Sequence, residues 1–331
     1  MLAVGGVDLE ITKVEIHHYS LQPKTALNRL STVGARSGTL LRIWFKDLAK
    51  PGHADLFPWV ELGDLPLGLQ LETLKEGTPL PLVAASVLWA YEEARAVAQG
   101  VSFFPGTAIP CHTTLLDRSE MNAEVKLAKL KISAHEVANW QDTEEFFKQF
   151  PETQWRLDFN GLFHDLNDAR DFWEQVSPAA RKKIEFLEDP VSEELMASPE
   201  LKKIFTGSKI ALDRHLSEEN IKNAHVLVLK PVMFAPDILV AVALGFKGDV
   251  VVTSAMDHPL GQLIALRGAQ LIQKVIGPRS SAAGLLTHSC YEAHAASSWV
   301  KTEKGTLCPT NAGLGWGVRD QLDQLKWEPL T

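Results

Sequence analysis

Residues 125–133 read VKLAKLKIS, and the interpretation of the whole fold depends on the face on which their two lysines lie. Lys129 and Lys131 stand two positions apart in an otherwise apolar run, so both side chains point to the same side of a strand. Taken alone, this spacing is typical of an edge strand with two solvated lysines. The neighbouring strands decide between that interpretation and a site inside the fold.

Short apolar runs separated by helical segments recur after residue 108. The eight candidate strands are AIPCHTTLL (108–116), VKLAKLKI (125–132), WRLDFN (155–160), KIEFLEDP (183–190), KIALDRH (209–215), AHVLVLKP (224–231), DVVVTSAM (249–256) and AGLLTHS (283–289). Such alternation indicates a parallel sheet covered on both faces, and eight units fit a (β/α)₈-type barrel. The alternative is an open doubly wound sheet, but no glycine-rich phosphate loop follows an early strand.

The first hundred or so residues have a different pattern. Residues 13–20 and 39–46 alternate like strands, and 59–63 is a third candidate after the turn at Pro51-Gly52. Residues 79–98 carry apolar side chains at helical spacing. Strands followed by helices predict an α+β module ahead of the barrel.

Charged and polar residues fall at the carboxyl ends of the predicted strands, which form the catalytic face of such a barrel. Asp158, Glu188 and Asp213 would bring three carboxylates to one mouth, where they repel one another. A hard divalent cation resolves that repulsion, and all-oxygen ligation favours Mg²⁺. Singly, each carboxylate is explained as well by a helix cap or a solvated loop. Together, at matched strand ends, they predict a metal site.

The lysines gain a role beside such a metal. Lys129 would depress the pKa of Lys131, which helps to supply a neutral amine as a general base. Lys230, at the end of the sixth predicted strand, would approach from the opposite wall of the barrel. A metal flanked by two lysines suits removal of a proton next to a carboxylate.

Bulk properties exclude several classes of protein. With 45% hydrophobic and 22% charged residues the composition is that of a globular protein, and the net charge of −8 argues against a nucleic-acid partner. Three widely spaced cysteines indicate a reducing compartment. The N-terminus lacks a secretory-signal pattern, and charged residues and prolines interrupt the apolar window at 225–246. We therefore expect a cytoplasmic protein without a membrane span.

Together these positions resemble the muconate lactonizing subgroup of the enolase superfamily. Its pattern of K-x-K, D-x-N, E-D-P, an aspartate and a lysine on successive strands stands here as KLK, DFN, EDP, LD (212–213) and LK (229–230). The resemblance covers the whole chain and implies an enolase-like modified TIM barrel over residues 108–294. It also implies an α+β capping domain over residues 1–107, completed by the tail 295–331.

Within the subgroup, the segments AKLKIS, RLDFNGLF, LVLKP and VVTSAMDHPLG resemble the o-succinylbenzoate synthases, lyases of menaquinone (vitamin K2) biosynthesis. This resemblance implies Mg²⁺-dependent syn-dehydration of 2-succinyl-6-hydroxy-2,4-cyclohexadiene-1-carboxylate to 2-succinylbenzoate, with Mn²⁺ as a possible substitute. Lys131 would take the proton and return it to the departing hydroxyl, and Lys230 would stabilise the anion. The implied substrate-binding residues are Asn160, Ser254, Ala255, Gly261 and Arg29, with Arg36 as the alternative to Arg29.

The chain departs from the family pattern at two places. Arg214-His215 follows Asp213, where an acidic and then a small residue are usual, and Asp257 stands where a glutamate is usual. Two other functions stay open at this point. An N-acylamino acid racemase or dipeptide epimerase would use both opposed lysines as bases, although the acidic residues expected of a dipeptide epimerase are missing from LLTHS at 285–289. A non-catalytic metal-binding scaffold would need neither lysine. The partner is a small-molecule carboxylate, and the chain is a monomer or a homo-oligomer.

Overall fold

The computed structural model describes residues 2–4, 7–27, 34–106 and 108–331, which form two compact units. Unit 1 comprises Met1–Pro110, Lys230–Gly245 and Val252–Thr331, and unit 2 comprises Cys111–Leu229 and Phe246–Val251. This division does not coincide with the capping domain and barrel expected from the sequence. The boundaries at residues 107 and 295 stay a prediction.

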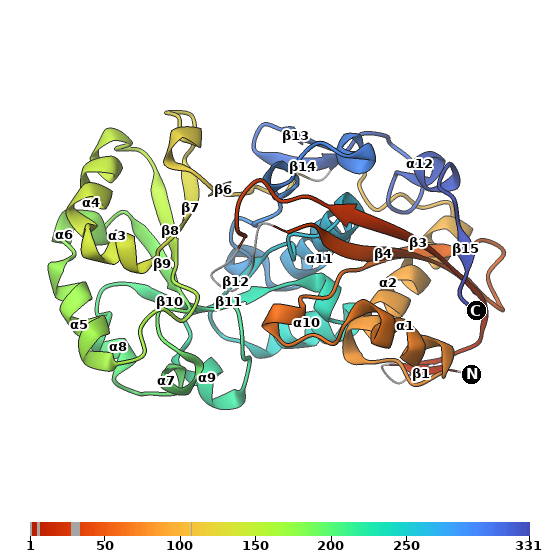
Figure 1. Cartoon of the computed structure of the whole chain (residues 1–331), viewed down its shortest axis with the longest axis horizontal. Helices are drawn as coiled ribbons and strands as arrows, with labels where there is room; N and C mark the ends of the chain where they lie inside the picture. Colours follow the sequence, from red (N-terminus) through yellow and green to blue (C-terminus); the bar gives the residue numbers. More distant parts are fainter. Residues whose placement is uncertain (1, 5–6, 28–33, 107) are drawn as a thin grey trace. The chain divides into compact units, whose positions relative to one another are not determined.

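Unit 2 is built on a parallel sheet (Figure 1). Its strands are β6 (Thr113–Leu115), β7 (Leu127–Lys131), β8 (Gln154–Asp158), β9 (Ile184–Glu188), β10 (Lys209–Leu212), β11 (Val226–Leu229) and β12 (Asp249–Val252). The order β12-β11-β10-β9-β8-β7-β6 follows the sequence, and the pairs from β6 to β11 are parallel. A sheet that grows by one neighbour at a time and curls is the wall of a barrel.

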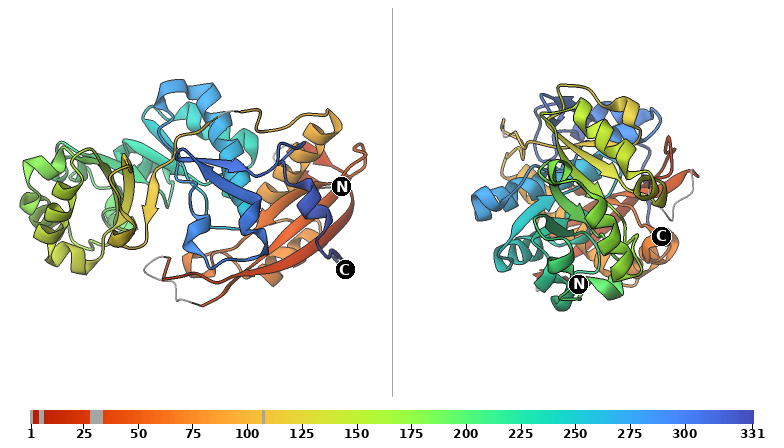
Figure 2. Two further views of the ribbon diagram at one scale, coloured as in Figure 1. Left: turned by 90° about the horizontal axis from the view of Figure 1, so that it is seen from above. Right: turned by 90° about the vertical axis from the view of Figure 1, so that its left-hand side faces the viewer.

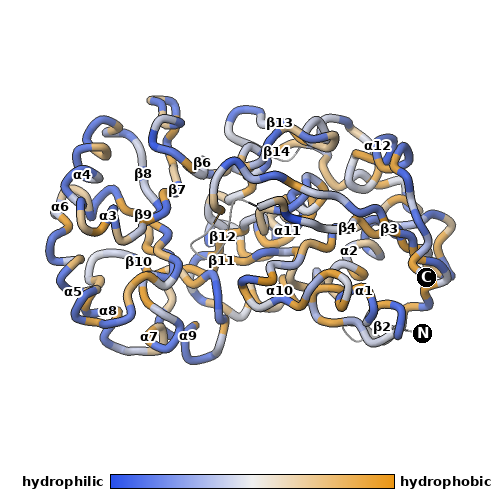
Figure 3. Tube along the Cα trace, viewed as in Figure 1, coloured by the Kyte–Doolittle hydropathy of each residue, from blue (hydrophilic) through white to orange (hydrophobic). Residues whose placement is uncertain are grey.

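Short helices connect these strands. They are η2 (Arg118–Glu120), α3 (Ala134–Ala138), α4 (Trp140–Gln149), α5 (Leu166–Gln175), α6 (Pro178–Arg181), α7 (Glu193–Met196), α8 (Leu201–Ile204) and α9 (Glu218–Asn223). The sequence fixes where several begin: Ser133 and Glu136 form a capping box on α3, and Asp165 caps α5. Hydrophilic and hydrophobic stretches alternate along α4 and α5 (Figure 3).

Both faces of this sheet are buried, as its apolar strands predict. On one face, a cluster of Phe186, Ala211, Val226, Val228 and Val251 fills the space enclosed by the strands. On the other face the indole of Trp155 stacks on Phe147 of α4, with ring centroids 4.4 Å apart. The enclosed face is therefore an interior, and its apolar residues are buried.

Unit 1 contains an antiparallel sheet of order β15-β3-β4-β5. Its strands are β3 (Ile11–Leu21), β4 (Arg36–Phe45), β5 (Gly52–Leu56) and β15 (Glu328–Pro329), and two further hairpins are β1 (Leu2–Val4) with β2 (Val7–Leu9) and β13 (Val300–Glu303) with β14 (Thr306–Pro309). Its helices are η1 (Val60–Leu62), α1 (Leu67–Lys75), α2 (Pro81–Ala98), η3 (Pro231–Met233), α10 (Pro236–Gly245), α11 (Pro259–Ile276), η4 (Gly277–Arg279), η5 (His288–Cys290), η6 (Ala295–Trp299) and α12 (Arg319–Asp323).

The end of the chain belongs to this sheet. Strand β15 pairs antiparallel with β3 through Glu328 and Ile16, and Figure 2 shows the blue C-terminal segment beside the red N-terminal strands. The indole of Trp316 is fully buried and donates to His53 O of β5 at 2.8 Å. The tail therefore completes the core around the N-terminal strands.

Two of the expected strands are wrong. Residues 59–63 form the single turn η1, which ends at Gly63 in the left-handed region (φ 103°), and the third strand is β5, directly after Pro51. The eighth barrel strand, 283–289, is reduced to bridges at Ala283 and Gly284. The Ala283 amide donates to Pro110 O, shortly before β6, and the Gly284 amide donates to Val252 O, at the end of β12. Two residues therefore take the place of the eighth strand. In the part of the chain that the structure describes, no helix has the length and apolarity to cross a membrane.

Candidate active site

The strand register brings the predicted site residues of unit 2 into one row. Lys131 is paired with Asp158, Asp158 with Glu188, and Glu188 with Ala211. Asp213 stands two residues beyond Ala211 and therefore projects to the same face. The row lies at the carboxyl ends of β7 to β10, on the enclosed side of the sheet.

Lys129 forms ion pairs with two of these carboxylates. Its Nζ lies 2.6 Å from Glu188 Oε1 and 3.0 Å from Asp158 Oδ2. Burial by itself lowers the pKa of this ammonium, but the surrounding carboxylates of Asp158, Glu188 and Asp213 raise that pKa above its usual range overall. Lys129 is therefore a fixed positive charge, and its face is the interior of the sheet rather than a solvated edge.

The carboxylates influence one another. Burial, together with the negative charges of Asp158 and Asp213, raises the pKa of Glu188 to about 7. Burial alone would raise the pKa of Asp158, yet the two lysine ammonium groups hold it below its usual range. An all-carboxylate set of this kind suits a hard divalent cation. Within the described residues, however, no three His, Cys, Asp or Glu side chains already form a metal-binding group.

Lys131 differs from Lys129 in the direction of its pKa shift. Burial lowers the pKa of Lys131, and the cations of Lys129 and Arg214 lower it further, against the opposing effect of Asp158. A lysine with a lowered pKa supplies more of the neutral amine at neutral pH. The two lysines of the pair are thus an amine suited to proton transfer and a permanent cation.

Two neighbours of the row were not among the predicted site residues. Arg214 Nη2 donates to Asn160 Oδ1 at 3.1 Å, and Asn160 Nδ2 donates to Asp158 Oδ1 at 2.7 Å. Asp189 Oδ1 accepts from the backbone amide of Asp213 at 3.0 Å. Arg214 is adjacent in sequence to the predicted ligand Asp213, and Asp189 is adjacent to Glu188. This adjacency is the sequence feature from which their position near the site could have been predicted.

Comparison with known proteins shows which family the chain resembles. Residues 14–96 match the family model described as O-succinylbenzoate synthase, N-terminal domain. Over 331 aligned residues the chain is 29% identical to the o-succinylbenzoate synthase of Bdellovibrio bacteriovorus, covering 96% of this chain and 98% of the other. This chain is a relative of the o-succinylbenzoate synthases. Its relatives are hydro-lyases, and the chain is an enzyme, as its sequence predicts.

Solved structures agree on the fold of this o-succinylbenzoate synthase relative. A dipeptide epimerase from Enterococcus faecalis V583, complexed with Mg and L-Leu-L-Tyr, has a TM-score of 0.74 at 13% identity, covering 93% of this chain and 99% of that one. The muconate lactonizing enzyme from Pseudomonas fluorescens, complexed with muconolactone, has a TM-score of 0.72 at 15% identity, with 93% and 96% covered. These likenesses confirm the predicted enolase-like barrel with a capping domain.

The other predicted site residues of the chain lie in unit 1. Lys230 directly follows β11, and Ser254 and Ala255 follow β12. The Ser254 amide donates to Gly284 O at 3.0 Å, and Ala255 O accepts from the indole of Trp59 at 2.8 Å. Gly261 lies in the first turn of α11.

Of the two alternative arginines, Arg29 lies outside the described residues, and Arg36 begins β4. The guanidinium of Arg36 makes two hydrogen bonds to Glu61, of 2.5 and 3.2 Å, and lies 3.6 Å from the ring centre of Trp59. Arg36 is thus held by its own neighbours.

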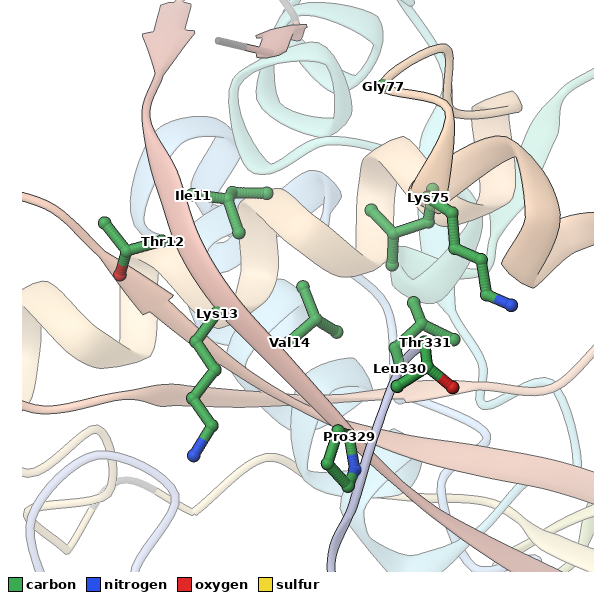
Figure 4. A pocket seen from close by; sticks show the side chains of 10 residues that line it. Ile11, Thr12, Lys13, Val14, Lys75, Gly77, Pro329, Leu330 and Thr331 are labelled. Carbon is green, nitrogen blue, oxygen red and sulfur yellow. The ribbon is translucent and has the colours of Figure 1, made fainter.

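A groove elsewhere in unit 1 is unrelated to these residues. Its volume is about 500 Å³, and β3, the end of α1 and the last residues of the chain line it (Figure 4). Lys13 and Lys75 stand at this groove, whereas none of the predicted catalytic, metal or substrate-binding residues does.

Proposed function

We propose that this enzyme is an o-succinylbenzoate synthase, which dehydrates 2-succinyl-6-hydroxy-2,4-cyclohexadiene-1-carboxylate to 2-succinylbenzoate in menaquinone biosynthesis. The match of residues 14–96 to the N-terminal domain of that family supports the choice of this reaction over others on the same fold. Similarity to a curated o-succinylbenzoate synthase along nearly the whole chain supports it further. We place the reaction in the cytoplasm, because the three cysteines are free thiols, as in a reducing compartment.

In the proposed reaction Lys131 Nζ takes the proton next to the ring carboxylate. The same ammonium then protonates the hydroxyl that leaves, so that both events occur on one face of the ring. Lys129 stays charged and, together with burial, lowers the pKa of Lys131, which favours the neutral amine before the proton is transferred. Lys230 stabilises the negative charge that develops on the substrate.

We propose Mg²⁺, or Mn²⁺ in its place, as the cofactor, held by Asp158, Glu188 and Asp213. When bound, it would neutralise the substrate carboxylate and so make the neighbouring proton more acidic. The donor types support this assignment. Asp158 and Glu188 are buried and Asp213 is half-buried, and all three stand at the ends of successive strands. Their negative charge demands positive charge that Lys129 alone balances only in part.

The test is a dehydration assay with purified protein and Mg²⁺, in which the aromatic product is followed by ultraviolet absorbance. Absence of product in the presence of Mg²⁺ would sink the assignment. Lys131→Ala should lower kcat by at least about 100-fold, the lower end of general acid–base contributions. Lys126→Ala, an exposed lysine just before β7, is the matched control and should keep full activity.

A dipeptide epimerase is the second candidate, because an epimerase shares the fold with a TM-score of 0.74. That reaction exchanges the proton next to the carboxylate with solvent, whereas the dehydration eliminates water. Incubation of L-Leu-L-Tyr with the enzyme in deuterated water, followed by mass spectrometry, separates the two. Deuterium uptake without any dehydration activity would favour the epimerase.

A further inference from the structure

Two aspartates from distant parts of the sequence face each other in the core of unit 1. Asp55 lies in β5 and Asp257 in the loop before α11, and they are 2% and 0% exposed. A Cβ built on Gly261 would lie 2.4 Å from Asp257 Oδ2 and 2.7 Å from Asp55 Oδ2. Both carboxyl groups therefore border one small space, which exists because residue 261 is glycine.

The surroundings of this pair supply little compensation. Tyr19 of β3 donates to Asp55 Oδ1 at 2.6 Å, and backbone amides lower the pKa of both carboxyl groups. Among the described residues, however, Asp55 Oδ2 and both Asp257 oxygens are buried without a side-chain hydrogen-bond partner. Two buried carboxylates this close cannot both ionise at ordinary cost, because desolvation and mutual repulsion add up. Burial raises the pKa of Asp257 to about 7, and burial and the charge of Asp257 raise that of Asp55 well above its usual range.

The other titratable groups around the pair do not remove this conflict. On the loop of Asp257 itself, burial lowers the pKa of His258 well below its usual range, so this imidazole is neutral and accepts from the Leu260 amide. Tyr291, after η5, donates to Met256 O. Arg36 of β4 acts on Tyr291 but is bound to Glu61.

We propose that Asp55 and Asp257 share one proton, and that this shared proton fastens the segment carrying Ser254 and Ala255 to β5. Met256, between Ala255 and Asp257, has a left-handed backbone (φ 52°), a conformation that needs support from its neighbours. The pair is a positioning device. Its link to substrate rests on the proposed function, for which Ser254 and Ala255 are expected substrate-binding residues.

The proposal predicts a defined dependence of stability on pH. An aspartate in the unfolded chain has a pKa of about 3.9, so between about pH 4 and pH 7 only the folded state keeps the shared proton. Stability contributed by this proton is complete below pH 4 and is lost as pH rises to 7. Loss of the shared proton should lower the folding equilibrium constant by up to about tenfold per pH unit between about pH 4 and pH 7.

Denaturant unfolding of the full chain at pH 5, 6, 7 and 8 tests this, with Asp257→Asn and Asp55→Asn as variants. Asparagine can donate to the remaining carboxylate without a shared proton. The ratio of the folding constants of variant and parent should therefore rise between pH 5 and 7 and level off above. Asp257→Glu, which keeps a carboxyl group, should retain the pH dependence of the parent. Asp47→Asn, at an exposed turn, is the control and should give a constant ratio.

Infrared difference spectra give a direct check. The parent at pH 6 should show the carbonyl band of a buried protonated carboxyl group, and this band should disappear in either asparagine variant. A pH-independent ratio, or a parent without this band, would overturn the proposal. Neither readout requires turnover, so the pair can be established even if the dehydratase assignment fails. If that assignment holds, Asp257→Asn should alter KM with pH more than kcat.

Discussion

Lys129 shows at the scale of one residue why the KLK segment is not a surface feature. Its ammonium contacts Asp158 and Glu188, so the three side chains depend on one another for charge balance. Removing one member of a buried ion pair is strongly destabilising, since the remaining charge is left without a partner. A divalent cation bound to the carboxylates would replace part of the missing charge.

Lys129→Met should therefore lower the free energy of unfolding by about 3–5 kcal/mol in the absence of divalent cations. Added Mg²⁺ should recover more stability in this variant than in the parent, because ligand binding to the folded state stabilises it. Thermal unfolding with Mg²⁺ and with EDTA measures both effects. Lys126→Met, at an exposed position, is the matched control, and an equal effect of the two substitutions would contradict the prediction.

At the scale of elements, the contact of β5 with α2 depends on one glycine. A Cβ at Gly52 would lie 1.7 Å from Ala90 O of α2, so the strand and the helix touch through their backbones. The sequence suggested a turn at Pro51-Gly52, and β5 was missed for that reason. The need for close approach to α2 explains why a residue with low strand propensity begins a buried strand.

Gly52→Ala should accordingly cost about 1–3 kcal/mol or more, because neither backbone can give way without loss of the packing around it. Gly68 in α1 offers the opposite case, since a Cβ there meets no atom within 4 Å. Gly68→Ala should raise stability by up to about 0.5–1 kcal/mol, through the smaller entropy of the unfolded chain. Denaturant unfolding should show a lower free energy of unfolding for Gly52→Ala and a higher one for Gly68→Ala. An equal loss of stability in both variants would contradict the packing argument.

Other elements separate what sequence can predict from what it cannot. Seven barrel strands were predicted within a few residues, because each contains a short apolar run, and six of these runs carry a polar residue at or near the carboxyl end. The pairing of Asp55 with Asp257 and of Lys129 with Glu188 was not predicted, since such contacts join distant segments. The prediction of an eighth strand was wrong because, within 283–289, only Ala283 and Gly284 make bridges before η5 begins at His288.

At the scale of the whole molecule, unit 1 is joined by a buried charged network. Glu93 of α2 is fully buried and accepts from the His53 amide at 2.6 Å, His53 Nδ1 at 2.9 Å and Arg319 Nη1 at 3.1 Å. A Cβ on Gly315 would lie 2.7 Å from Glu93 Oε1. One carboxylate thus connects β5, α2 and the tail.

Glu93→Ala should lower the free energy of unfolding by about 3–5 kcal/mol, since two donors and a guanidinium lose their acceptor in the core. Glu92→Ala is the natural comparison. Its ion pairs with Arg95 and Arg267 are 3.8 and 3.5 Å long and partly exposed, so the expected cost is below about 1 kcal/mol. If denaturant unfolding showed that the two substitutions lower the free energy of unfolding equally, the Glu93 network would contribute nothing to stability.

The interleaving of the two units has a consequence for synthesis on the ribosome. Unit 2 contains no residue beyond Val251, so all of it is made before the segment Val252–Thr331 of unit 1. Unit 1 begins at the N-terminus but still lacks Trp316, Arg319 and β15 at that stage. The N-terminal strands must therefore wait for residues made much later, and β3 is without its partner strand β15 until Glu328 and Pro329 have been made.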